Sequence, residues 1–443
     1  MTNYSDHPFF SKSFQWLFLS IALSSSVFYS CSPISNRALS KTFHATEEKF
    51  KDHVGFVLYD PAKKKTLFDY QGAQYFTPAS NTKIFTFFTS LKILGDSIPG
   101  LRYIVHGDSL IFWGTGDPGL LYKNVYTNGR VYNFLKASPY KLFFSVSNFD
   151  TEHFGPGWAW DDYSSYYSAE RSPLPIYGNI AAIQAIGNKP EIQPPFFKKE
   201  LRIGIPQSSA DANRESDKNV FTYIPGTKVS SKVIDVPLKI SPFLTATLLS
   251  DTLNKSVTLL NKPFDSTALT IFNIPSDSLY RIMMQESDNF IAEQLLLLCA
   301  GTLSDTLKTE IAIEYSKKNF LNDLSDDPIW KDGSGLSRFN LFTPRSIVQL
   351  WEKIYTLVPQ ERLFTLLAIG GKKGTIRNYY KETQPYIFGK TGSLSNNHAL
   401  SGYLLTKRGK VLIFSFMNTH FAKSTSEVRN NMQEILHKIY EAY

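Results

Sequence analysis

Cysteine is scarce in this sequence: Cys31 and Cys299 are the only two among 443 residues. Because we assign Cys31 to an N-terminal lipid anchor below, a single cysteine is left, and a disulfide framework is excluded. Cys299 lies within the apolar run 295–300, which predicts a small buried hydrophobic side chain. A chain of this length has enough residues for a large core and for two or three structural units.

Strong charge patterns and metal-binding patterns are also lacking. A net charge of +8 is modest for 443 residues, and no long basic run is present, which argues against nucleic-acid binding. The positive balance would suit an anionic envelope polymer, and an ordinary solvated surface explains it equally well. The eight histidines, which include His44, His106, His398 and His420, show no spacing typical of metal ligands. We therefore predict no metal and no cofactor, and the sequence leaves the oligomeric state open.

The N-terminus predicts export. Lys12 precedes the apolar run 14–23, and small residues then lead to Cys31, a pattern typical of a signal sequence and too short for a membrane span. Residues 28–31 are similar to a bacterial lipoprotein box, from which the aromatic residues depart at two positions. We expect a signal peptide at 1–30, lipidation of Cys31 and a location in the periplasm or cell envelope. The alternative is a plain signal sequence that is cleaved nearby.

Three short motifs follow one another along the chain: Ser-Asn-Thr-Lys at 80–83, Ser-Asp-Asn at 287–289 and Lys-Thr-Gly at 390–392. Each is weak alone, since Ser-x-x-Lys recurs at 138–141 and Ser-x-Asn at 395–397. The second Ser-x-x-Lys copy leads into a predicted strand, so its two side chains would not share a helix face. The ordered triple, each member in a suitable local context, carries the functional prediction.

The first motif begins a predicted helix. Apolar residues follow it in one helical stripe, which Gly95 ends: Ile84, Phe85, Phe88, Leu91 and Leu94. Ser80 would lie in the first turn, and Lys83 would lie on the same face within reach of its hydroxyl. A capping serine with a solvated lysine is the alternative for this motif alone.

The other two motifs lie at a helix break and at a strand. Residues 287–289 separate two apolar helical runs, where an ordinary turn is the alternative explanation. Residues 390–392 open a strand region that continues through a hairpin over 399–405 and 411–417. An edge strand there would pair with an extended peptide substrate, and Gly392 would let the ligand backbone approach closely. A surface lysine before a turn is the alternative.

The triple supplies what a serine nucleophile needs: a group that takes its proton, a relay to the leaving amine and a positive charge for the substrate. It is the signature described for penicillin-binding proteins and serine β-lactamases. Longer blocks add specificity, and they lie at 78–83, 116–118, 157–162, 287–289, 332–338, 374–377 and 390–392. With these blocks the chain, from about residue 50 onward, resembles the D-alanyl-D-alanine carboxypeptidase/endopeptidase family of class C low-molecular-mass penicillin-binding proteins.

The resemblance implies a serine D-Ala-D-Ala carboxypeptidase/endopeptidase acting on peptidoglycan stem peptides and acylated by β-lactams. It implies that Ser80 is the nucleophile and Lys83 its base, and that Ser287 relays a proton to the leaving amine. The residues implied to bind substrate are Asn289, Lys390, Thr391, Gly392 and Ser393. The backbone N–H groups of Ser80 and Ser393 would form the oxyanion hole.

Spacing predicts a split catalytic domain. The 207 residues between Ser80 and Ser287 are far too many for a loop in a compact domain. We expect an α+β fold in which residues 31–97 and 275–443 form a penicillin-binding-protein/β-lactamase-like domain, an antiparallel sheet flanked by helices. Residues 98–274 would form a β-rich insert of one or more domains. Within the insert, the polar stretch 207–217 is predicted to be a loop.

Three other functions stay open. A serine β-lactamase would share the motifs, but no Glu-x-x-Leu-Asn segment lies between Ser287 and Lys390, where one large class keeps its deacylating carboxylate. A non-catalytic envelope protein would bind penicillin without releasing D-alanine. A sugar-binding protein would use the aromatic residues at 158–167, for which domain packing is the favoured explanation. The balance of carboxypeptidase, endopeptidase and transpeptidase activity depends on the shape of the cleft.

Overall fold

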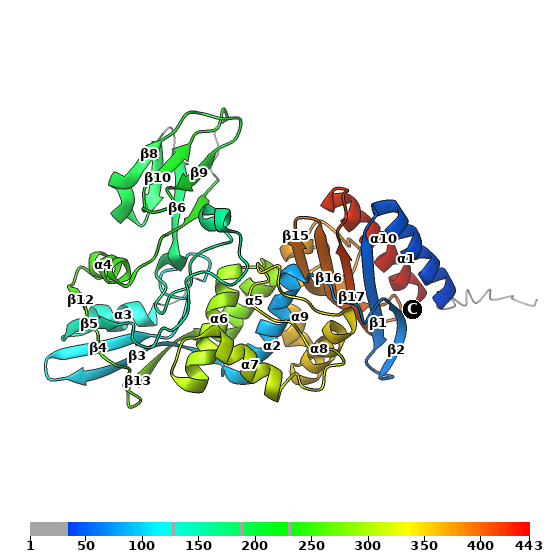
Figure 1. Cartoon of the computed structure of the whole chain (residues 1–443), viewed down its shortest axis with the longest axis horizontal. Helices are drawn as coiled ribbons and strands as arrows, with labels where there is room; N and C mark the ends of the chain where they lie inside the picture. Colours follow the sequence, from blue (N-terminus) through cyan, green and yellow to red (C-terminus); the bar gives the residue numbers. More distant parts are fainter. Residues whose placement is uncertain (1–33, 126–128, 187–188, 229–231) are drawn as a thin grey trace, which may run out of the picture.

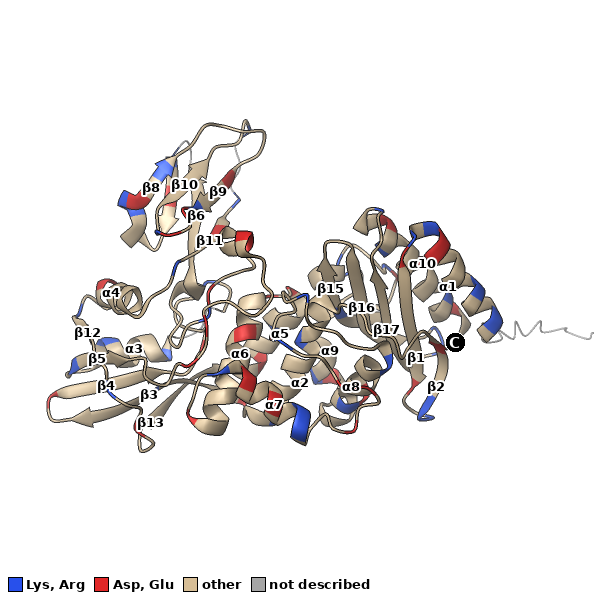
Figure 2. Cartoon of the chain, in the orientation of Figure 1, with Lys and Arg blue, Asp and Glu red and all other residues tan. Residues whose placement is uncertain are grey.

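The structure is a computed structural model that describes residues 34–125, 129–186, 189–228 and 232–443 (Figure 1). The predicted signal peptide and the predicted lipidation site, Cys31, lie outside the described residues. Within these ranges, no helix combines the length and the apolar character that a membrane span requires. Charged side chains of both signs are scattered over the elements rather than gathered in one patch (Figure 2).

A six-stranded sheet with strand order β14-β15-β16-β17-β1-β2 joins the two ends of the sequence. Its strands are β1 (His53–Asp60), β2 (Lys65–Tyr70), β14 (Ala368–Ile369), β15 (Ile387–Leu394), β16 (Asn397–Leu405) and β17 (Val411–Thr419). Within this open sheet, β1, the first strand of the chain, pairs with β17, the last. All neighbouring pairs are antiparallel, and the predicted hairpin over 399–405 and 411–417 is confirmed.

Helices α1 (Asn36–Phe50) and α10 (Thr425–Ala442) cover one face of this sheet (Figure 1). Ser424 caps α10, because its hydroxyl accepts the backbone N–H of Glu427. The helix packs on the sheet through an apolar stripe, in which Val428, Met432, Ile435 and Ile439 are buried. This layer holds the sheet from behind and leaves its other face for the helices that carry the motifs.

In the part of the chain that the structure describes, six helices pack over the other face of the sheet: α2 (Lys83–Ile93), α5 (Ser276–Gln285), α6 (Asn289–Ser304), α7 (Thr309–Asn319), α8 (Pro344–Leu357) and α9 (Gln360–Leu366). The predicted stripe is buried at Ile84, Phe85, Phe88 and Leu94, and burial extends to every residue from Lys83 to Ser90. The helix is enclosed, and its polar side chains bond inside the core. Thr86 Oγ1 donates to the carbonyl of Gly333 at 2.7 Å, and Thr89 bonds the hydroxyl of Ser316 at 2.7 Å.

The described residues between α2 and α5 build three further sheets. Five strands have the order β12-β5-β4-β3-β13: β3 (Ser97–His106), β4 (Ser109–Gly114), β5 (Lys141–Ser145), β12 (Val257–Leu259) and β13 (Leu269–Pro275). Two three-stranded sheets contain β6 (Ile180–Ile186), β7 (Lys189–Gln193), β11 (Ile234–Pro237), β8 (Leu201–Ile203), β9 (Asp211–Arg214) and β10 (Phe221–Ile224). The first strand of this segment, β3, pairs with its last, β13, so the chain leaves and re-enters at neighbouring positions.

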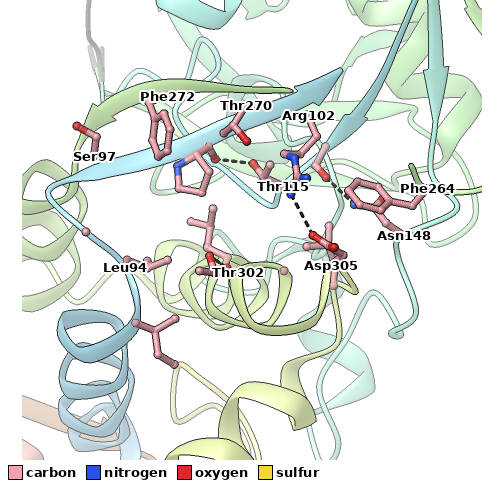
Figure 3. Close-up of a pocket in the computed structure, with 17 residues that line it drawn as sticks. Leu94, Ser97, Arg102, Thr115, Asn148, Phe264, Thr270, Phe272, Thr302 and Asp305 are labelled. Atoms are coloured by element: carbon pink, nitrogen blue, oxygen red, sulfur yellow. Dashed lines mark hydrogen bonds and ion pairs between the residues drawn. The ribbon is translucent and has the colours of Figure 1, made fainter. Parts of the chain in front are cut away.

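Two described helices of this segment, α3 (Arg130–Ala137) and α4 (Pro242–Leu253), were not predicted. The prediction of a loop at 207–217 was also wrong, since β9 occupies 211–214 and buries Arg214. Polar composition misled here because alternate residues of β9 face the core while the others face solvent. Where the five-stranded sheet meets the C-terminal half of α6, a cavity of about 210 Å³ lies between the two (Figure 3).

Candidate active site

The fold brings the three predicted motifs together. Ser80 lies in a short 3₁₀ turn, Ala79–Thr82, and Lys83 begins α2 directly after it. Lys83 Nζ donates to Ser80 Oγ at 3.0 Å and to Asn289 Oδ1, at the start of α6, at 2.6 Å. Lys390 Nζ, on β15, donates to Ser287 Oγ at 2.8 Å. Residues from three distant parts of the sequence therefore meet around one serine hydroxyl.

The second copy of Ser-x-x-Lys has no comparable geometry. Ser138 ends the short helix α3, and Lys141 begins strand β5, as predicted. Lys141 is exposed, and its ammonium pairs with the Asp108 carboxylate at 2.7 Å on the surface. The prediction that these two side chains do not share a helix face is confirmed.

Lys83 is fully buried and donates to three acceptors, the third being the backbone carbonyl of Ser334 at 2.6 Å. Burial lowers the pKa of Lys83 to about 8, against the opposing effect of the nearby carboxylates of Asp332, Glu293 and Asp288. A lysine with this pKa is partly neutral near neutral pH. Its lone pair can then accept the proton of the Ser80 hydroxyl 3.0 Å away.

Asn81 fastens the serine turn to the sheet. Its amide Nδ2 donates to the carbonyl of Lys390 at 3.1 Å, and its Oδ1 accepts the Ser401 hydroxyl at 2.5 Å. Gly392 makes the close approach possible, since a Cβ there would lie 2.4 Å from the carbonyl oxygen of Pro78 and 2.9 Å from the Ser80 nitrogen. The predicted substrate-binding residue Gly392 thus packs directly against the turn that holds Ser80.

Lys390 is also fully buried, and it donates to Ser287 Oγ and to the carbonyl of Thr391 at 2.7 Å. Burial lowers the pKa of Lys390 well below the usual lysine value, and the charge of Lys83 lowers it further. Ser287 adopts a positive φ of 65°, a strained conformation that directs it out of the break between α5 and α6. Two lysines and two serines thus form one continuous polar cluster.

Both polar atoms of the Asn289 side-chain amide already have hydrogen-bond partners. Oδ1 accepts from Lys83, and Nδ2 donates to the carbonyl of Tyr167 at 2.9 Å. In this arrangement Asn289 orients the Lys83 ammonium. The predicted contact of Asn289 with a substrate amide stays a prediction, because it requires the substrate to replace one of these partners.

Thr391 and Ser393 project from the same strand, β15. Thr391 Oγ1 donates to Thr375 Oγ1 at 2.7 Å. Ser393 Oγ lies 2.7 Å from His398 Nδ1 and accepts from Arg429 Nη2 at 3.3 Å. Burial and the charge of Arg429 lower the pKa of His398 to about 3, so the imidazole is neutral and accepts the Ser393 proton.

A loop at 332–340 was not assigned a role from the sequence, although residues 332–338 form one of the blocks behind the resemblance. The Asp332 carboxylate accepts the backbone N–H groups of Gly335 and Ser337 at 2.9 and 2.7 Å. It also accepts Asn340 Nδ2 at 2.7 Å and Trp158 Nε1 at 2.9 Å. These four bonds fold the loop so that its Ser334 carbonyl faces Lys83.

Glu293 is a second supporting residue that the sequence analysis missed. Its Oε1 accepts the Ser334 N–H at 2.7 Å, and its Oε2 lies 3.4 Å from Arg171 Nη1. Burial raises the pKa of Glu293 to about 7, and the neighbouring Asp332 raises it further. The spacing could have indicated it, because Glu293 follows Asn289 by four residues and so lies on the same face of α6.

Arg171 belongs to a segment that we call the strap, residues 153–171. The ends of the strap are tied together, since Arg171 N donates to the His153 carbonyl at 2.9 Å and His153 Nδ1 lies 2.7 Å from the Arg171 carbonyl. Of the aromatic residues singled out in the sequence, Trp158 packs toward Asp332. Trp160 and Tyr166 are 86% and 72% exposed, so the packing explanation holds for only part of that cluster.

Within the described ranges, no group of three or more His, Cys, Asp or Glu side chains is arranged to hold a metal ion. The chemistry available at the site is therefore argued from its lysines, hydroxyls and amides. A serine hydroxyl beside a lysine of lowered pKa, next to a second buried cation, suits attack on a carbonyl in an anionic substrate.

Comparisons with known proteins agree with this geometry. A model described as the D-Ala-D-Ala carboxypeptidase 3 (S13) family matches residues 38–439. D-alanyl-D-alanine carboxypeptidase DacB of Haemophilus influenzae is 26% identical over 420 residues, covering 83% of this chain and 85% of that protein. The crystal structure of penicillin binding protein 4 (dacB) from H. influenzae superposes with a TM-score of 0.73 at 20% identity, covering 90% of this chain and 99% of that one. Its complex with a novel β-lactam superposes with a TM-score of 0.68 at 18% identity and the same coverage.

Gly335 tests how the Asp332 loop is held against the serine turn. It has a φ of 84°, and a Cβ there would lie 1.9 Å from the Ala79 carbonyl oxygen. We expect Gly335→Ala to lower the free energy of unfolding by at least about 2 kcal/mol, since backbone strain alone costs about 1–3 kcal/mol. Denaturant unfolding measures this, with Gly95→Ala as the control, because a Cβ at Gly95 meets nothing within 4 Å. Equal stabilities of the two variants would contradict the described packing.

Proposed function

The chain belongs to the D-Ala-D-Ala carboxypeptidase 3 (S13) family, and we propose that Ser80 is the nucleophile through which it acts. The protein is a serine-type D-Ala-D-Ala carboxypeptidase that acts on peptidoglycan peptides. The observation that carries the assignment of Ser80 is its 3.0 Å hydrogen bond from a fully buried Lys83 whose pKa is lowered to about 8.

In the first step, neutral Lys83 takes the proton of the Ser80 hydroxyl while the oxygen attacks the carbonyl carbon of the D-Ala-D-Ala peptide bond. Asn289 and the Ser334 carbonyl hold Lys83 Nζ at 2.6 Å each, which fixes the amine toward Ser80. The ammonium that forms is stabilised by the buried carboxylates around it. We assign the oxyanion to the backbone N–H groups of Ser80 and Ser393, as the resemblance implies.

In the second step, the bond to the terminal D-alanine breaks, and its nitrogen needs a proton. Ser287 is our proposed donor. Its oxygen accepts a hydrogen bond from Lys390 at 2.8 Å, so its own O–H is free to point toward the departing amine. A bound substrate carboxylate favours the charged form of Lys390, and that charge then makes this hydroxyl a better donor. Water releases the acyl-enzyme in the final step.

The terminal carboxylate of the substrate would be held by Lys390 and the Thr391 hydroxyl. Thr375 joins them, because its hydroxyl accepts from Thr391 at 2.7 Å and lies at the same end of the site. A buried ammonium without a carboxylate partner nearby is costly in an empty site, and an anionic substrate offsets that cost. This requirement favours peptides that end in a free carboxylate.

The same pocket should be acylated by β-lactams and should cleave cross-bridges whose acyl donor is D-alanine. Bulkier peptide substrates need a free strand edge to bind along. The edge of β15 from Lys390 to Leu394 can provide it, because β14 pairs only with Phe388 and Gly389. The rest of that strand edge can pair with an extended peptide. A β-lactamase or a non-catalytic penicillin-binding protein would share the acylation and differ in the fate of the acyl-enzyme.

Activity on peptidoglycan places the enzyme in the cell envelope. We propose that residues 1–30 direct export and that Cys31 carries a lipid, which would hold the enzyme at a membrane surface. We further propose the division of the chain into a catalytic domain, 31–97 with 275–443, and an insert, 98–274. The pairing of β3 with β13 supports these boundaries, because the insert then joins the catalytic domain at two adjacent strands.

The first experiment compares the two copies of Ser-x-x-Lys. We expect Ser80→Ala to abolish both the covalent penicillin adduct and the release of D-alanine, because no other hydroxyl among the described residues is bonded to Lys83. Ser138→Ala is the matched control, since Ser138 lies in the other copy and should leave both activities within about twofold. Intact-protein mass spectrometry with a labelled penicillin, and D-alanine release from purified muropeptides, provide the measurements. An adduct that persists in Ser80→Ala would rule out the assignment.

A second experiment tests carboxylate recognition by Lys390. We expect Lys390→Ala to reduce kcat/KM for a peptide with a free C-terminal carboxylate by at least about 10-fold, since a charge-assisted hydrogen bond contributes about 1.5–3 kcal/mol. The same peptide with a C-terminal amide should lose less, because its terminus is neutral. The decisive value is therefore the preference for carboxylate over amide, which the variant should lose. A preference that stays unchanged would contradict the role proposed for Lys390.

A further inference from the structure

A second polar cavity lies behind the strap, apart from the Ser80 cluster. It has a volume of about 270 Å³, and its walls come from the strap and from other parts of the insert, near β9 and β11. A cavity of about 150 Å³ already holds a molecule of the size of benzene. The cavity is therefore large enough for a small organic ligand. Two buried charged side chains, Glu170 and Arg214, form part of its lining.

Arg214 is only 2% exposed, yet one of its nitrogens has no bonded partner among the described residues. Nε donates to the Pro237 carbonyl at 2.8 Å, and Nη1 donates to the carbonyls of Glu215 and Ser216 at 2.6 and 3.0 Å. Nη2 has no hydrogen bond to any described residue, and it is not among the sealed-off polar atoms of the protein. Its two N–H groups are thus available to the cavity.

Glu170 presents the complementary case. It is 5% exposed, and its Oε2 accepts the Ile240 N–H at 2.9 Å. Oε1 has no hydrogen bond to a described residue, and it too is not sealed off. Burial raises the pKa of Glu170, while the nearby charges of Arg214 and Lys239 act in the opposite direction.

The two groups line one cavity without pairing with each other. Among the described residues, no nitrogen of Arg214 lies within 4.0 Å of a Glu170 oxygen, although a buried carboxylate and a buried guanidinium normally pair when they can. Each is held in place by backbone groups from a different segment, so the gap between them is built into the fold. Buried charges with unused hydrogen-bonding atoms require a partner.

We propose that this cavity binds a zwitterionic amino-acid group, with its ammonium on Glu170 and its carboxylate on Arg214. An ammonium supplies the donor that Glu170 Oε1 lacks, and a carboxylate supplies the acceptor that Arg214 Nη2 lacks. Lys239 also lines the cavity, where its charge acts on Glu170 and its ammonium lies 3.7 Å from the Asp217 carboxylate. The Tyr163 ring lies 5.2 Å from the Arg214 guanidinium and covers one side of that group.

The cavity of Figure 3 lacks these features, which shows what distinguishes the proposed site. Its charged side chains, Arg102 and Asp305, already pair with each other at 3.0 Å. Its unpartnered atom, Asn148 Oδ1, is sealed from the cavity space. Among the described residues that line that cavity, the two charges therefore balance each other, unlike those of Glu170 and Arg214.

Two sources of a zwitterion exist if the proposed function holds: the free D-alanine that the reaction releases, and a short D-alanyl peptide. The binding chemistry itself does not depend on the proposed function, because it follows from Glu170 and Arg214 alone. D-alanine and D-alanyl-D-alanine therefore serve as the two probes. Acetate and ethylammonium, each with one of the two charges, serve as half-ligand controls.

The experiment measures binding by saturation-transfer NMR on the full chain after its active site has been blocked by penicillin. The adduct on Ser80 is checked by mass spectrometry, so that binding in the catalytic site does not contribute. We expect saturable binding of at least one zwitterion, with each half-ligand at least about 10-fold weaker. Glu170→Gln should weaken the zwitterion at least about 10-fold, and the surface variant Glu191→Gln should leave it unchanged. Whichever probe binds more tightly identifies the source.

Several results would overturn the proposal: no saturable binding, equal affinity for acetate and alanine, or no effect of Glu170→Gln. If Glu170→Gln does not fold, the affinities of the unsubstituted protein decide: each half-ligand should bind at least about 10-fold more weakly than the zwitterion, and equal affinities would overturn the proposal. The absence of a penicillin adduct would count against the proposed function alone. The titration would then be repeated on the unmodified protein, where dependence on Glu170 still decides the second site.

Discussion

The burial of the Lys83 ammonium is the constraint on which the rest of the site depends. Removing a charged amine from water is costly, and the cost appears as a pKa lowered to about 8. The protein limits this cost by giving Nζ three acceptors, so that the amine is desolvated but not left without hydrogen bonds. A lysine on the surface would stay charged at neutral pH and could not take a proton from serine. The fold therefore has to enclose the first two turns of α2, and every residue from Lys83 to Ser90 is buried.

The supporting parts come from segments that are far apart in the sequence. The sheet places Lys390 and Gly392 against the serine turn, the 332–340 loop directs a carbonyl at Lys83, and the strap supplies Arg171 to Glu293. The strap is itself part of the insert, so the insert contacts the catalytic cluster through Arg171. Its other side forms the wall of the zwitterion cavity through Glu170, the residue next to Arg171. An insert of this size is consequently part of the construction of the site and not only an appendage.

Much of this was predictable because local chemistry and spacing carry it. The helix break at Ser287, the hairpins of the sheet and the stripe on α10 each follow from patterns within a few residues. The supporting carboxylates Asp332 and Glu293 could not be assigned in the same way, because their roles arise from contacts across about 120 to 250 residues. The same reason explains why β9 was predicted to be a loop. Its sequence is polar, and only the folded structure shows that Arg214 is buried. The roles of Asp332 and Glu293 and the strand β9 depend on tertiary packing, which local sequence patterns do not reveal.

The most direct test of the account is the pKa of Lys83 itself. NMR titration of the protein with isotopically labelled lysine side chains, compared with the Lys83→Arg variant, identifies the Lys83 signal by its loss. The account predicts that this signal titrates near pH 8, well below the usual lysine value of 10.5, and that penicillin acylation accelerates as the pH rises through the same range. A Lys83 signal that titrates near 10.5 would contradict it, because the amine would then be charged when the serine has to be activated.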